Sequence, residues 1–339
     1  MVRCCTILAR LIALPALFGW LSLPLVAQEQ AAGKILEIVV SEAVGGGSDS
    51  VARLVSRHIG RQLPGQPTVV VRNMPGAGGL AGANYLFNIA PRDGSTIGMV
   101  DQSIETQQLF HSKGLMADVL RFNWLGRAMS NNAVLFAWYK APVKTIEEAF
   151  QREIAVSASG QSSLMRWTAL KRITGIKFKL IVGHQGTAEA TLAMERGEVD
   201  ALSAPWTLVR STHADWIRDG KINLLLQTGL DRDHDLQNLP RLVDLARDDQ
   251  QRKVLELLSQ PERIGRSLTA PPGVPLERVA MLRKAMAQMF IDPEFLADAK
   301  TMKIDLDPLG GEALQDMIRS GMTYSPDVVA RAESFVQPD

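Results

Sequence analysis

The sequence has almost no cysteine. Its only two, Cys4 and Cys5, stand before the apolar run with which the chain begins. The remaining chain therefore has no disulfide, and it lacks the thiolate ligands that structural zinc sites prefer. Without disulfides the fold needs a large hydrophobic core. A chain of 339 residues with 46% hydrophobic content is long and apolar enough to supply one.

An excess of charge of either sign is also missing. The chain has 37 basic and 36 acidic residues, with a formal net charge of +1. Proteins that bind nucleic acids or membrane surfaces usually carry a clear basic excess or a basic patch. We therefore expect neither nucleic acid nor a membrane surface as a partner.

Long hydrophobic runs are absent except at the start. Leu11–Leu25 is apolar, follows the basic Arg3 and Arg10, and ends in the small-residue stretch Leu25–Ala27. Proline and glycine interrupt this run, and it is short for a membrane span. The pattern predicts a cleaved signal peptide at residues 1–27 and an exported, periplasmic product.

Several motifs of catalysis and cofactor binding are missing. The sequence contains no P-loop, no G-x-S-x-G elbow and no H-E-x-x-H helix. Gly76–Ala81 fits a bare dinucleotide pattern with Asp101 as a possible ribose ligand, but an exported protein lacks a supply of nicotinamide cofactor. Asp231–Asp235 begins like a calcium loop, yet Leu236 and Leu242 replace the required glycine and glutamate. We expect no cofactor and no metal.

Ile35–Leu63 is the most informative stretch that is present. It predicts a strand at Ile35–Val40, a glycine-rich turn, and then an amphipathic helix with one apolar face, formed by Val51, Leu54, Val55, Ile59 and Leu63. Ser48 or Asp49 is expected to cap this helix. A helix N-terminus reached by a glycine turn can bind an anion, although an ordinary connection has the same residues.

The same unit recurs. A strand at Thr68–Arg72 is followed by the turn Asn73–Gly79, and a strand at Ser95–Val100 is followed by Asp101–Ser103. Repeated strand–turn–helix units predict a parallel sheet with helices on its faces. The turns then lie at the carboxyl edge of the sheet, where α/β proteins bind ligands.

Two further units follow in the middle of the chain. The strand Ile154–Ser157 leads into the turn Ser157–Ser163, and Lys179–Val182 leads into Gly183–Thr187. All four turns are rich in glycine, serine and threonine and poor in charge, so they suit a carboxylate bound by backbone N–H groups and hydroxyls. His184 is the only histidine expected near a cleft.

The expected ligand-binding residues come from these turns and from the end of the third strand. They are Val44, Gly45, Gly46, Gly47, Ser48, Asp49, Ala77, Gly78, Gly79, Ser103, Ser157, Ser159, Gln161, Ser162, His184 and Gln185. No catalytic residue is expected, because binding requires none.

At these positions the chain resembles the extracytoplasmic solute receptors of tripartite tricarboxylate transporters, often called Bug receptors. Asn73–Gly79 matches their Asn-x-Pro-Gly-Ala-Gly-Gly signature fully, and Val44–Asp49 corresponds to their first glycine loop. Ala90–Gly94, Gly197–Asp200 and Ala270–Pro275 correspond to three further family motifs. The resemblance adds Asp200 to the expected ligand-binding residues.

The resemblance implies a two-lobed α/β clamshell, in which each lobe is a mostly parallel sheet flanked by helices. Lobe 1 would comprise residues 34–131 plus 265–339, and lobe 2 residues 132–264. Two crossing strands would form the hinge, near Asn131–Leu135 and Arg263–Ser267. Such a receptor, expected here as a monomer, captures a small organic carboxylate and delivers it to membrane transporter subunits.

Two alternatives use the same cleft. One is an exported hydrolase with His184 as general base and Ser157 or Ser159 as nucleophile. The other is a sensory receptor that signals to a membrane kinase. The chain also departs from the family's usual cleft residues at Ser41–Val44, Ser157–Gly160 and His184–Gly186, so the resemblance does not identify the ligand.

Overall fold

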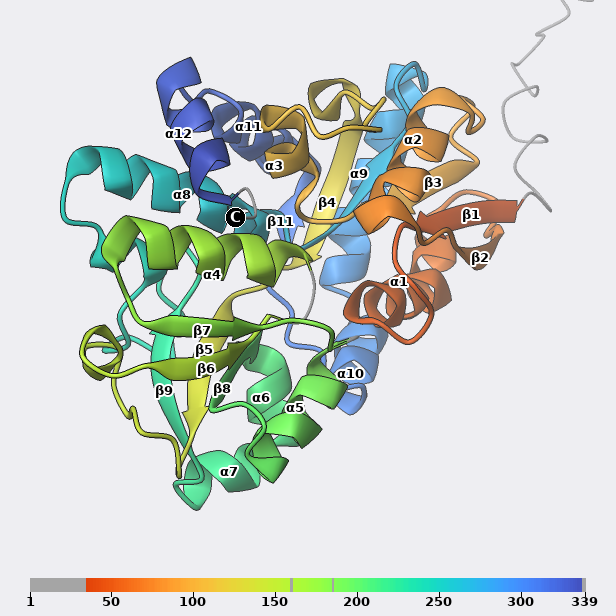
Figure 1. Ribbon diagram of the computed structural model, residues 1–339. Helices are drawn as coiled ribbons and strands as arrows, with labels where there is room; N and C mark the ends of the chain where they lie inside the picture. Colours follow the sequence, from red (N-terminus) through yellow and green to blue (C-terminus); the bar gives the residue numbers. More distant parts are fainter. Residues whose placement is uncertain (1–34, 159–160, 185, 337–339) are drawn as a thin grey trace, which may run out of the picture.

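The computed structural model describes residues 35–158, 161–184 and 186–336 (Figure 1), so the expected signal peptide lies outside the described residues. The strands form two sheets, one of six strands in the order β11-β4-β10-β3-β1-β2 and one of five in the order β7-β6-β8-β5-β9. The strands are β1 Ile35–Val40, β2 Thr68–Asn73, β3 Thr96–Met99, β4 Asn123–Met129, β5 Ala133–Trp138, β6 Ile154–Ser157, β7 Phe178–Ile181, β8 Ala201–Pro205, β9 Ile222–Gln227, β10 Arg266–Ala270 and β11 Leu309–Gly310.

Helices cover both sheets. They are α1 Gly47–His58, α2 Leu80–Asn88, α3 Ile104–Leu109, α4 Gln161–Thr174, α5 Thr187–Arg196, α6 Trp206–Thr212, α7 Ala214–Arg218, α8 Asp249–Ile264, α9 Leu276–Phe290, α10 Pro293–Thr301, α11 Gly311–Gly321 and α12 Pro326–Val336. Short 3-10 segments are η1 Ile59–Gln62, η2 Ala77–Gly79, η3 Val119–Arg121, η4 Glu148–Phe150 and η5 Leu242–Leu245.

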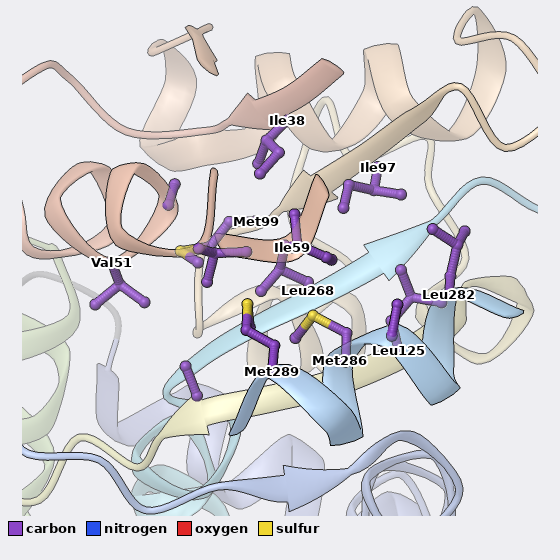
Figure 2. Packing of buried hydrophobic residues seen from close by; sticks show 14 of the residues in the cluster. Ile38, Val51, Ile59, Ile97, Met99, Leu125, Leu268, Leu282, Met286 and Met289 are labelled. Carbon is purple, nitrogen blue, oxygen red and sulfur yellow. The ribbon is translucent and has the colours of Figure 1, made fainter. Parts of the chain in front are cut away.

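In the first sheet the parallel strands are β1, β2 and β3, which come from the N-terminal strand–turn–helix units. β1 pairs in parallel with both β2 and β3, whereas β10 pairs antiparallel with β3 and β4. The apolar face predicted for the first helix is confirmed, since Val51, Leu54, Val55, Ile59 and Leu63 are all buried. Figure 2 shows Val51 and Ile59 of this face in one cluster with Met286 and Met289 of α9 and with residues of the sheet.

The second sheet repeats the arrangement. β6 is parallel to β7 and β8, and β5 runs antiparallel to β8 and β9. The two-lobed α/β architecture is therefore confirmed. Each sheet is mixed and not mostly parallel as expected, because β5 and β10, the strands that arrive from the other lobe, run against their neighbours. The predicted turns belong to the parallel halves.

Within the described residues the chain passes between the two lobes three times. Residues 130–132 join β4 to β5 and Gly265 joins α8 to β10, at the two places where hinge segments were expected. A third passage, residues 322–325, leads from α11 to α12. Helix α12 packs against α4 and α8 (Figure 1), although residues 265–339 were assigned to lobe 1 from the sequence.

The first two passages touch each other. The Asn131 N–H donates to the Glu262 carbonyl at 2.9 Å, and Arg127 Nη1 donates to the Arg263 carbonyl at 2.6 Å. Gly265 has φ +53°, and a Cβ on it would lie 2.2 Å from the Met129 carbonyl oxygen. The contact between the passages therefore depends on a residue without a side chain.

We expect Gly265→Ala to lower the free energy of unfolding by about 3 kcal/mol or more, because it combines backbone strain with a clash against the neighbouring passage. Gly197→Ala is the matched control. Gly197 also has positive φ, +77°, but nothing lies within 4 Å of its Cβ position, so strain alone should cost about 1 kcal/mol. Urea unfolding measures the free energy of unfolding of both variants. Equal losses in the two would contradict the tight contact between the passages at Gly265.

Candidate functional site

The side chain of Asp49 stabilises the first glycine turn through hydrogen bonds. Asp49 is 2% exposed, and its carboxylate accepts hydrogen bonds from the Gly45 N–H at 2.9 Å and from Asn73 Nδ2 at 3.0 Å. Arg53 Nε donates to the same carboxylate at 2.9 Å. The hydrogen bond from Arg53 is the main cause that lowers the pKa of Asp49 from 3.8 to about 2. Asp49 thus ties the first turn to the second through Asn73.

The prediction that Ser48 or Asp49 caps α1 is wrong. The N-cap residue is Gly46, which makes no side-chain cap, and Ser48 Oγ donates to Glu42 Oε1 at 2.6 Å instead. Asp49 faces back toward Gly45 rather than covering the helix end. The first-turn N–H groups of α1 have no intrahelical partner, so this end remains suited to an anion.

The second turn lies against the end of β3. Gly76, Ala77, Gly78 and Gly79 all have positive φ, and a Cβ on Gly79 would lie 2.6 Å from the Cβ of Asp101. Close packing of this turn therefore requires glycine.

Ser103 is held beside the second turn. Its N–H donates to Asp101 Oδ1 at 2.9 Å, and Gln107 Nε2 donates both to Ser103 Oγ at 2.9 Å and to the Gly78 carbonyl at 3.2 Å. Burial raises the pKa of Asp101. The structure thus brings the expected residues Ala77, Gly78, Gly79 and Ser103 together.

In the second lobe the expected residues Ser157 and His184 meet. Ser157 ends β6 and pairs with Ile181 of the parallel strand β7, so both turns lie at one edge of the sheet. Ser157 Oγ lies 2.9 Å from His184 Nδ1. Within the described residues no carboxylate is hydrogen-bonded to His184, so the pair lacks the acid that completes a catalytic triad.

The structure does not fully describe the other expected residues of this lobe. Ser159 and Gln185 lie outside the described residues, and so do the side chains of Gln161 and Ser162, with which α4 begins.

Asp200 does not lie with Ser157 and His184. It precedes β8, and its Oδ2 accepts a hydrogen bond from the Ala155 N–H at 2.8 Å near the start of β6. The parallel strands β6 and β8 end at the opposite edge, where Ser157 lies. Asp200 fastens two strands at their amino ends, and we remove it from the candidate site.

A cavity of about 360 Å³ lies between the lobes. Ala77, Gly78 and Ser103 line it from the first lobe, and Arg166 of α4 and Leu258 of α8 line it from the other side. The rest of the lining is formed by Leu80, Thr106, Gln107, Ser112, Lys113, Met165 and Pro261. Three of the expected ligand-binding residues thus line a cavity that both lobes enclose.

The sequence analysis missed Thr106, Lys113 and Arg166. A signal for Arg166 was present, because Leu170 and Ile173 follow it at helical spacing and are buried. A cation on the buried face of a helix needs a partner, and Glu262 supplies one through an ion pair with Arg166 Nη2. Burial raises the pKa of Glu262, although Arg166 opposes this.

A second cavity, of about 510 Å³, adjoins the passages between the lobes. Acidic and basic side chains line it together, and Arg127 pairs with Asp307 at 2.7 Å. Nearby, Asp233, His234 and Asp235 offer ligand atoms within 4.8 Å of one another, but His234 is 76% exposed. This is the loop that begins like a calcium loop in the sequence, and among the described residues nothing else at it points to a metal.

Comparison with known proteins identifies the architecture. Residues 51–335 match the model of the tripartite tricarboxylate transporter family receptor. A UPF0065 protein from the gbd 5' region of Cupriavidus necator is 25% identical over 252 residues, which cover 70% of this chain and 72% of the relative.

Solved structures share the fold. A TctC solute-binding protein from Polaromonas is 21% identical, with a TM-score of 0.64 over 89% of this chain and 98% of that one. An R. palustris protein solved with adipate is 18% identical, with a TM-score of 0.65 over 88% and 97%. Among the described residues, no helix has the length and apolar character of a membrane span.

We expect Asp49→Asn to lower stability at pH 7 by about 2 kcal/mol, from the depressed pKa of this carboxyl group. A lowered folded-state pKa stabilises the protein above the unfolded value near 4, and this stabilisation is lost as the pH falls toward 2. The difference in the free energy of unfolding between the wild type and Asp49→Asn should therefore shrink over that pH range, and urea unfolding measures it. Glu153→Gln, at an exposed carboxylate, is the control and should show no such trend.

Proposed function

The chain belongs to the tripartite tricarboxylate transporter family of receptors, and from this premise we propose that it is a periplasmic solute-binding protein. It captures a small organic carboxylate between its two lobes and delivers it to the membrane subunits of a transporter. It works by closure around the ligand, and catalysis has no part in this role.

One observation carries the proposal. The cavity between the lobes is lined by Ala77, Gly78 and Ser103 on one side and by α4 and α8 on the other. A ligand bound there contacts both lobes at once. It therefore stabilises the closed arrangement over any more open one, which is the requirement for ligand-driven closure.

The carboxylate is bound mainly by backbone groups. On the first lobe we assign this role to the turn from Val44 to Ser48, at the uncapped end of α1, and to Ala77–Gly79. We assign Ser157 and His184 to the site from the second lobe, at the carboxyl edge of its sheet, although neither lines the cavity itself. Hydrogen bonds to a charged group contribute roughly 1.5–3 kcal/mol each, so a few of them account for micromolar affinity.

No comparable observation supports the two alternatives, an exported hydrolase and a sensory receptor for a membrane kinase. The Ser157–His184 contact fits an oriented hydrogen-bonding pair in a binding site, and the described residues add no acid to it. The R. palustris relative was solved with adipate, a carboxylate of the proposed class.

The proposal includes the organisation of the chain. Residues 1–27 form a signal peptide that is removed on export, and the mature protein acts as a monomer. Lobe 1 comprises residues 34–131 and the segment from 265 through α11, and lobe 2 comprises residues 132–264. Helix α12 joins lobe 2, because its Ala332 is buried in the same cluster as Leu170 and Leu258.

Scanning calorimetry of the mature protein against a panel of carboxylates tests the function. A micromolar ligand at millimolar concentration should raise the free energy of unfolding by about 4 kcal/mol. The proposal fails if no carboxylate stabilises the protein.

A matched pair of variants tests the site. Gly78 has φ +65° with nothing within 4 Å of its Cβ position, so asparagine or aspartate fits there. Gly78→Asp adds a negative charge to the turn and should weaken carboxylate binding about tenfold more than Gly78→Asn. Equal binding by the two variants in titration calorimetry would remove the second turn from the site.

A further inference from the structure

A buried carboxyl group lies where the two lobes meet. Glu105 of α3 is 1% exposed, and its Oε1 has no hydrogen-bond partner. We propose that protonation of Glu105 controls the packing of the lobes. The neutral acid allows α3 to pack against α8, and the carboxylate favours an arrangement in which water reaches it. The inference concerns the lobes alone, and its effect on ligand binding rests on the proposed function.

Glu105 lies between elements of both lobes. α3 and α11 belong to the first lobe, and both pack against α8 of the second. A Cβ on Gly321, the last residue of α11, would lie 3.1 Å from Glu105 Oε2 and 3.5 Å from Gln260 Oε1 of α8. The third passage, residues 322–325, begins directly after Gly321. A rotation of the lobes moves α8 against α3, and it therefore changes the access of water to Glu105.

The charged and titratable groups around Glu105 leave it without an ion pair. Arg263 interacts with it from the end of α8, but Arg263 Nε lies 3.7 Å from Asp231 Oδ2, and within the described residues no ion pair joins Arg263 to Glu105. From the third passage the phenol of Tyr324 interacts with it. On the η3 side Asp118 is a further acid, which accepts a hydrogen bond from a glutamine of α3 at 3.2 Å. The charged residues of α11 are exposed, namely Glu312, Asp316 and Arg319.

A neutral carboxylic acid fits these surroundings better than a carboxylate. Gln260 Nε2 donates to Tyr324 Oη at 2.8 Å, so the amide oxygen of Gln260 is the atom on the side of Glu105. An amide oxygen accepts a hydrogen bond from a protonated carboxyl group but donates none to a carboxylate. Burial, opposed by Arg263, raises the pKa of Glu105 to about 8. At pH 7 the folded protein therefore carries Glu105 chiefly as the neutral acid.

The two helices that bury Glu105 also line the cavity between the lobes. Thr106 of α3 lines it from the first lobe, and Leu258 and Pro261 of α8 line it from the second. A movement of α3 against α8 therefore changes the cavity and the surroundings of Glu105 together. Because such coupling is reciprocal, closure around a ligand and protonation of Glu105 favour each other.

The pH dependence of stability tests the buried charge. The folded-state pKa of Glu105, about 8, lies above the unfolded value near 4.3, so folding takes up a proton between these values and stability is lost as the pH rises. Relative to Glu105→Gln, the folding equilibrium constant of the wild type should fall about tenfold per pH unit between about pH 5 and pH 8 in urea unfolding. Above pH 8 the ratio should be constant.

Glu153→Gln is the matched control, because it makes the same change at an exposed carboxylate. Its stability should follow that of the wild type at every pH. A wild type that runs parallel to Glu105→Gln over this range overturns the inference. Glu105→Met is a second neutral variant, and it should show the same missing pH dependence as Glu105→Gln.

A distance between the lobes tests the conformational part. The chain has no cysteine after Cys5, so Ala214→Cys on α7 and Lys284→Cys on α9 place spin labels at one exposed position of each lobe. In pulsed electron paramagnetic resonance of the labelled mature protein, the distance between the labels should shift by about 2 Å or more between pH 6 and pH 9.5. With Glu105→Gln or Glu105→Met added, the distance found at pH 6 should persist at pH 9.5.

Two results overturn the control of the lobes by Glu105. One is an unchanged distance in the labelled wild type, even if its stability depends on pH as expected. The other is the same shift with and without a neutral residue at position 105. Neither measurement uses a ligand, so these failures leave the proposed function intact, which fails only if no carboxylate stabilises the protein.

Discussion

The arrangement of the two lobes depends on the contact between the chain passages that join them. The backbone around Glu262 and Arg263 accepts hydrogen bonds from Asn131 and Arg127, and Gly265 allows the two segments to touch. The side chain of Glu262 also holds Arg166, which lines the cavity between the lobes. The connection between the lobes and one wall of the cavity therefore depend on the same short stretch of chain, so a rotation of the lobes would alter the surroundings of Arg166.

The glycine turns offer backbone N–H groups whose positions are fixed by the fold, with Asp49 and Asn73 holding one turn against the next. Such groups recognise a carboxylate without a neutralising side chain.

Much of this was predictable from local sequence. Largely apolar runs such as Ile35–Val40 predicted the strands, and helical spacing predicted the buried face of α1. The parallel order then placed the turns at one edge. Asp200 was misassigned because a family motif was followed, although its position before a strand implies the amino edge. The packing of α12 and the pairing of Arg166 with Glu262 join residues far apart in sequence, which local patterns do not encode.

The position of α12 has a consequence for how the protein folds. The core of the second lobe includes Ala332 of α12, and the first sheet needs β10 between β3 and β4. Each lobe therefore depends on a segment that follows residues of the other lobe in the sequence. Contacts between such distant segments form slowly. Neither lobe is a contiguous stretch of chain that can complete its core without residues from beyond the other lobe.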